Sequence, residues 1–92
     1  MTRESRFVIL QISCALLVKR YLPNAPKSLA DDLFTELIHL ASISPTHQSG
    51  PSIEENEHSV GRLLSVMETQ NCQNSDLAKA LIQEVAEIYP VN

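Results

Sequence analysis

Residues 7–18 read Phe7-Val8-Ile9-Leu10-Gln11-Ile12-Ser13-Cys14-Ala15-Leu16-Leu17-Val18, and no other part of the chain constrains the fold as strongly. Only Gln11 and Ser13 are clearly polar, so a helix through this stretch is apolar in nearly every direction around its axis. Such a helix has to be covered on all sides, either by its own domain or by another chain. In a chain of 92 residues, three further short helices can cover roughly half of that surface. The excess apolar surface therefore predicts a homodimer.

The same stretch has the outline of a signal peptide, because Arg3 and Arg6 precede an apolar run of about 7–15 residues. However, Lys19, Arg20 and Tyr21 follow it, where small residues would mark a cleavage site. The run is also shorter than the about 20 apolar residues that a membrane-spanning helix needs. We therefore expect the core helix of a cytoplasmic protein that does not bind a membrane and whose cysteines are reduced.

The composition fits one small globular domain over residues 1–92. Apolar residues make up 43% of the chain and charged residues 20%, which excludes the disordered and low-complexity classes of protein. The chain has two cysteines, too few for a disulfide framework, and two glycines, too few for a β-barrel or β-sandwich. The fold class that remains is all-α.

Four helical segments account for the apolar pattern, and no segment alternates with the period of a strand. Pro23 ends the first helix, because its ring is incompatible with a helix interior. Ser28 is predicted to cap the second helix, with Asp31 placed as in a capping box. Gly61 costs the third helix about 1 kcal/mol relative to alanine, which predicts a close helix crossing there. The expected small bundle has helices over about residues 5–22, 28–42, 53–69 and 75–89, with a flexible linker over 43–52.

Charge is distributed unevenly along the chain. Residues 1–27 contain five basic residues and one acidic residue, whereas residues 28–92 contain two basic and ten acidic residues. One interpretation is that a basic first helix packs against an acidic remainder. The other is that the basic residues near the ends of the first helix bind a partner, and these are Arg3, Arg6, Lys19 and Arg20. Their small number and the net charge of −4 disfavour DNA as that partner.

No group of residues has the spacing of a catalytic or metal site. His39, His47 and His58 do not form an i, i+4 metal-binding pair with one another. Cys14 and Cys72 lack the Cys-x-x-Cys spacing of a redox pair, and two glycines cannot build a phosphate-binding loop. We expect Cys14 in the core and Cys72 as an exposed thiol in a turn. The sequence therefore predicts a protein that is not an enzyme and that has no cofactor and no bound metal.

Two parts of the chain resemble a known family. They are Ala15-Leu16-Leu17-Val18-Lys19-Arg20-Tyr21-Leu22 followed by Leu33-Phe34-Thr35-Glu36-Leu37-Ile38-His39-Leu40, and Arg62-Leu63-Leu64-Ser65-Val66-Met67-Glu68-Thr69 followed by the run from Leu77 to Ile88. Together they are similar to the AriR/YmgB and YcgZ group of small enterobacterial regulators. The resemblance implies a small helical dimer, a non-catalytic connector in signalling for biofilm formation and acid resistance with proposed DNA association. It implies no catalytic residues.

Three functions remain open at this point. The favoured one is a dimeric regulator that acts by protein–protein interaction in bacterial signalling, stress response or biofilm control. Its expected dimer interface consists of Phe7, Ile9, Leu10, Leu16 and Leu17. The second is a secretion chaperone or anti-sigma-like inhibitor that binds one protein client in an apolar groove. The third is a direct DNA-binding regulator, whose binding should weaken steeply with added salt.

Overall fold

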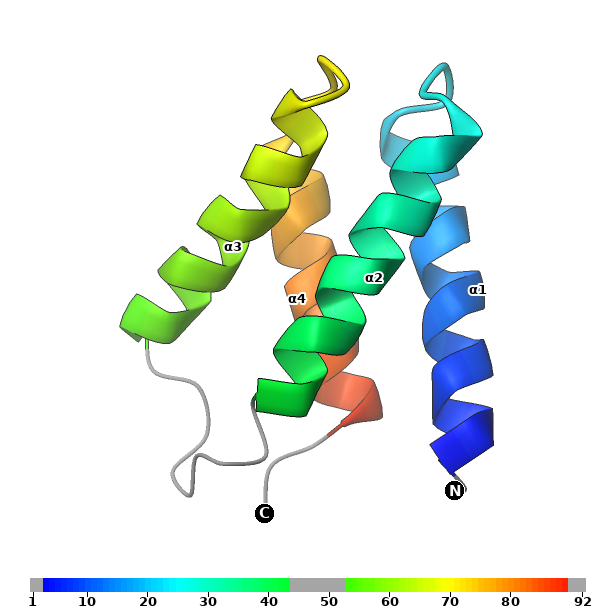
Figure 1. Ribbon diagram of the computed structural model, residues 1–92, viewed down its shortest axis with the longest axis vertical. Coiled ribbons are helices and arrows are strands. Elements are labelled where there is room, and N and C mark those ends of the chain that lie inside the picture. Colours follow the sequence, from blue (N-terminus) through cyan, green and yellow to red (C-terminus); the bar gives the residue numbers. More distant parts are fainter. Residues whose placement is uncertain (1–2, 44–52, 90–92) are drawn as a thin grey trace.

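The computed structural model describes residues 3–43 and 53–89, with side chains from residues 4–40 and 57–89. These residues form four α-helices and no strand, which confirms the predicted all-α fold (Figure 1). The helices are α1 (Arg3–Tyr21), α2 (Lys27–Ile43), α3 (Ile53–Glu68) and α4 (Ser75–Ile88), and each begins and ends within two residues of the expected position. The expected flexible linker lies outside the described residues, apart from its first residue, Ile43.

Consecutive helices run in opposite directions and close into a bundle (Figure 1). α1 packs on α2 and α4, α3 packs on the same two helices, and α2 also contacts α4. Within residues 3–43 and 53–89, α1 and α3 make no contact, because α2 and α4 lie between them. α1 therefore occupies one flank of the molecule and turns one of its faces away from the other helices.

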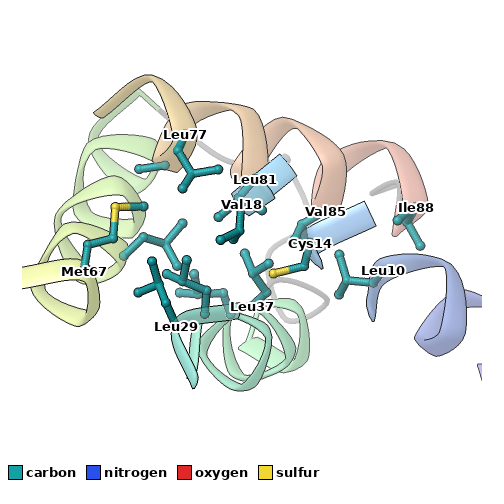
Figure 2. Packing of buried hydrophobic residues seen from close by; sticks show 14 residues of the cluster. Leu10, Cys14, Val18, Leu29, Leu37, Met67, Leu77, Leu81, Val85 and Ile88 are labelled. Carbon is teal, nitrogen blue, oxygen red and sulfur yellow. The ribbon is translucent and has the colours of Figure 1, made fainter. Parts of the chain in front are cut away.

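All four helices contribute to a single core, and every buried side chain among those the structure describes is apolar (Figure 2). From α1 come Leu10, Cys14 and Val18, which are spaced by four residues and so share one side of that helix. The opposing helices contribute Leu29, Leu33, Leu37 and Leu40 of α2, Leu63 and Met67 of α3, and Leu77, Ala78, Leu81, Val85 and Ile88 of α4. No side-chain nitrogen or oxygen buried among the described residues lacks a hydrogen-bond partner. The core therefore carries no desolvation penalty from unpaired polar side chains.

The start of α2 differs from the sequence prediction. The helix begins at Lys27, and the Leu29 amide donates to the carbonyl oxygen of Pro26 at 3.0 Å. Ser28 thus lies inside the first turn, and the prediction that it caps the helix is wrong. Its hydroxyl donates instead to Oε1 of Gln70 at 2.9 Å, and Nε2 of Gln70 donates to Oδ2 of Asp32 at 2.6 Å. These two hydrogen bonds tie the start of α2 to the turn after α3.

That turn closes the end of α3 with a Schellman motif. The amide of Cys72 donates to the carbonyl oxygen of Met67 at 2.9 Å, and the amide of Asn71 donates to that of Glu68 at 3.0 Å. Asn71 has φ 55°, in the left-handed region that the motif requires and that asparagine tolerates better than most residues. Cys72 packs against the core directly after it.

Gly61 lies on an exposed part of α3, where a Cβ atom would meet nothing within 4 Å. The prediction of a close helix crossing at Gly61 is therefore wrong. Glycine remains at this position without a packing reason in the described structure.

Replacing Gly61 by alanine should raise the free energy of unfolding by about 0.5–1 kcal/mol, because alanine loses less backbone entropy in a helix and meets no neighbour. Urea denaturation followed by circular dichroism measures the change. Gly61→Pro is the matched control, and it should lower the stability by about 3 kcal/mol or more. A loss of stability in Gly61→Ala would contradict the open surroundings of this residue.

Replacing Asn71 by valine should lower the free energy of unfolding by about 1–2 kcal/mol, because a β-branched residue resists the left-handed conformation. Asn71→Gly should be at least as stable as the natural chain. The comparison variant is Gln73→Val in the same turn, where φ is not positive and the change should be small. Equal effects at the two positions in urea denaturation would exclude a role for the left-handed conformation.

Candidate protein-binding face

The histidines that the structure describes lie apart from one another. His39 and His58 are exposed on different helices, and His47 lies outside the described residues. In the part of the chain that the structure describes, no three histidine, cysteine, aspartate or glutamate residues come together to hold a metal ion. The features that remain as candidates are the two cysteines, one shallow pocket and the surface of α1.

Cys14 is held in an environment that suppresses thiol chemistry. It is almost fully buried, and its Sγ–H donates to the carbonyl oxygen of Ala30 with a sulfur–oxygen distance of 3.6 Å. Burial, together with the nearby negative charge of Asp31, raises the pKa of Cys14 from 9.0 to about 12. Because the thiolate is the reactive form, this thiol is a structural group and a poor nucleophile near neutral pH.

Cys72 is half-buried, although the sequence predicts an exposed thiol. Its Sγ–H donates to the carbonyl oxygen of Gln70 at 3.1 Å. It lines a shallow pocket of about 220 Å³ whose other walls are Tyr21, Leu22, Pro23, Asn24 and Ala25. Ligand sites are usually larger, about 300–1,000 Å³, and enclose most of the ligand. This pocket is therefore a weak candidate for a binding site.

The strongest candidate is the side of α1 that faces away from the core. Val8, Ile12 and Leu16 follow one another at intervals of four residues and are 50%, 54% and 62% exposed. Helical geometry places Ile12 roughly opposite Cys14, so this row and the core row lie on opposite sides of the same helix. We call this surface the outer face of α1, and its exposed residues are Glu4, Ser5, Val8, Ile9, Ile12, Ala15, Leu16, Lys19 and Arg20.

The residues of the predicted dimer interface separate into three groups. Ile9 and Leu16 lie on the outer face. Phe7 lies at its border, where its ring meets Phe34 edge-on with a centroid distance of 4.9 Å. Leu17 is half-buried against the core, and Leu10 has no exposed surface at all. Leu10 is thus a core residue and cannot contribute to a surface, because its side chain already packs inside its own chain.

Val8 and Ile12, which are central to the outer face, are absent from the predicted interface. Val8, Ile12 and Leu16 are spaced by four residues, a pattern that places them on one side of a helix. The row Leu10, Cys14 and Val18 gives the same signal, however, and nothing within α1 itself distinguishes the inner row from the outer one.

The four predicted partner-binding residues lie near the two ends of α1. The side chain of Arg3 is outside the described set, and the guanidinium of Arg6 lies 5.9 Å from the centroid of the Tyr89 ring, in a cation–π contact. Lys19 and Arg20 are exposed at the other end of the helix, about 20 Å from Arg6 along its axis. Arg6 is thus engaged within the chain, while Lys19 and Arg20 lie at the end of the outer face.

A scan against protein-family models finds no match to this chain, and neither does a search of curated proteins or of solved structures.

None of the helices in the described part of the chain combines the length and the apolar character that crossing a membrane requires.

At about pH 8, a chromogenic disulfide reagent should react with Cys72 in the folded protein and reach Cys14 only after unfolding, because the pKa of Cys14 is raised to about 12. The pKa of Cys14 is higher in the folded chain than its ordinary value of 9.0. The neutral thiol therefore stabilises the fold fully below pH 9.0, and this contribution decreases as the pH rises toward about 12. Cys72→Ser should abolish the reaction of the reagent with the folded chain, because Cys14 is then the remaining thiol and it is buried. Equal reaction rates for both thiols would contradict the burial of Cys14.

Proposed function

We propose that this protein is a non-catalytic regulatory protein that acts by binding protein chains through the outer face of α1, and that it forms a homodimer. The observation that carries the proposal is the row of half-exposed apolar side chains at Val8, Ile12 and Leu16, on a helix whose opposite side is already buried. Contiguous exposed apolar surface of this kind marks interaction sites in soluble proteins.

The energetic argument concerns what these side chains lose when they stay in water. Full burial of a valine, leucine or isoleucine side chain is worth about 1.5–3 kcal/mol, and each of the three residues is only about half-buried. Together they forgo an amount that is significant beside the about 5–15 kcal/mol of stability of a small domain. A second apolar surface packed on the outer face recovers much of this loss, against the cost of association.

The shape of the face favours self-association over capture of an extended client. The outer face is the convex side of one helix, and such surfaces pack against other helices through ridges and grooves. A secretion chaperone or anti-sigma-like inhibitor would present a groove to its client. The separation of Arg6 from Lys19 and Arg20 gives no support to a DNA-binding surface.

The setting that we propose for this regulator is the bacterial cytoplasm. The similarity of residues 15–22, 33–40, 62–69 and 77–88 to the AriR/YmgB and YcgZ group supports a role in signalling for stress response or biofilm control. In that role the protein would work as a connector, and its partner would be a signalling or transcription component.

The test is a single aspartate on the outer face. Leu16→Asp should weaken self-association at least about tenfold, because the interface would bury an unpaired carboxylate, while the circular dichroism spectrum stays helical. Sedimentation velocity at tens of micromolar should show the natural chain as a dimer and this variant as a monomer. Ser65→Asp on the exposed part of α3 is the matched control and should remain dimeric.

Leu10→Asp should unfold the chain, because it places a carboxylate in the core. A natural chain that sediments as a well-folded monomer at these concentrations would refute the homodimer. Dimerisation that Leu16→Asp leaves unchanged would show that the interface lies elsewhere.

A further inference from the structure

The outer face of α1 has a symmetric order along the helix. Its central residue is Ile12, with Val8 one turn before it and Leu16 one turn after it, and all three are half-exposed or more. Acidic and basic groups occupy opposite ends of this row, with Glu4 at one end and Lys19 and Arg20 at the other. The face therefore has apolar residues in the middle, the carboxylate of Glu4 at its start and two basic groups at its end, while the nearby Arg6 lies over the ring of Tyr89.

On the basis of the proposed function, we propose that the occupant of this face is α1 of a second copy, antiparallel to the first and related to it by a two-fold axis beside Ile12. In this arrangement the two Ile12 side chains meet at the axis. Val8 of each copy lies in the same layer as Leu16 of the other, because both are four residues from Ile12. Each Glu4 lies alongside Lys19 of the second copy, with Arg20 next to it.

Charge distinguishes this arrangement from a parallel one. A parallel pair would place Lys19 and Arg20 beside the same residues of the second copy and leave the two Glu4 side chains together, so that like charges meet at both ends. The antiparallel pair brings opposite charges together at both ends and also opposes the two helix dipoles. A two-fold axis gives each copy the same contacts, which closes the assembly at a dimer.

Among the helices that the structure describes, none packs on the outer face of α1. α1 lies at the flank of the molecule, and α2 and α4 pack on its other side (Figure 1). The core row at Leu10, Cys14 and Val18 points away from the outer face. A helix packed at the usual interaxial distance of about 8–10 Å therefore extends the molecule sideways without disturbing the core.

Disulfide trapping reads the orientation and the register directly. The background variant is Cys72→Ser, in which Cys14 stays because its buried thiol is unreactive. Ile12→Cys should form a disulfide-linked dimer by itself. Val8→Cys and Leu16→Cys should each remain largely unlinked alone, because the two copies of either residue lie about 12 Å apart along the helix axes, beyond disulfide reach. A mixture of these two variants should form the linked dimer, and Ser65→Cys on α3 should form none.

Charge reversal supplies an independent measurement. Glu4→Lys and Lys19→Glu should each weaken dimerisation by roughly 3- to 30-fold, because each removes a pair at both ends of the interface. The double variant should recover most of the affinity of the natural chain. Glu68→Lys, which makes the same charge change on an exposed part of α3, should have no effect.

The possible failures are distinguishable. If Val8→Cys and Leu16→Cys each link by themselves and their mixture adds nothing, the helices are parallel; the antiparallel inference is then wrong and the proposed dimer stands. If none of the cysteine variants links and the natural chain is a monomer, both proposals of self-association are wrong. If that monomer also sediments with vesicles of phosphatidylserine and phosphatidylcholine, the outer face binds anionic membranes and the inference is overturned.

Discussion

The contact between the row Leu10, Cys14 and Val18 and the apolar sides of α2 and α4 determines how α1 is oriented in the bundle. The helix is apolar on two opposite sides, and only one of them can pack on its own chain. Once this row is buried, the row Val8, Ile12 and Leu16 has to face outward, because residues four apart share a side of a helix. The exposed apolar surface is thus a direct consequence of how the core is assembled, and α3 is too far away to cover it.

Much of the fold could be predicted because the local signals agree with the tertiary structure. Pro23 lies just beyond α1 and marks where that helix ends. The leucines of α2 recur on one side of the helix and form its buried face. The positions of both helices could therefore be predicted from the sequence pattern alone. The errors concern residues whose role depends on distant neighbours. Ser28 is a good capping residue by type, yet its hydroxyl bonds Gln70, 42 residues away. A glycine marks a close helix crossing only where another helix approaches it, and a Cβ atom at Gly61 would meet nothing within 4 Å.

The sequence predicts that α1 has surplus apolar surface, but it does not predict which residues of the helix carry this surface. A helix that is apolar nearly all round indicates surplus surface, and this surplus is present at Ile9 and Leu16. Which residues carry it depends on the rotation of α1 against α2 and α4, and this rotation is not encoded within the helix itself. The assignment of Leu10 to the surface failed for that reason. Arg6 and Lys19 lie near opposite ends of α1, where the sequence analysis placed them, and the length of the helix separates them.

Gln70 gives the turn after α3 a further consequence. Its side chain bonds Ser28 and Asp32 on α2, while its neighbours Asn71 and Cys72 close the end of α3 through backbone hydrogen bonds. Fraying of α3 at this end would displace Gln70 and break its hydrogen bonds to Ser28 and Asp32 in α2. The two segments, although far apart in the chain, are thus linked by two side-chain hydrogen bonds, and we expect opening of one to weaken the other.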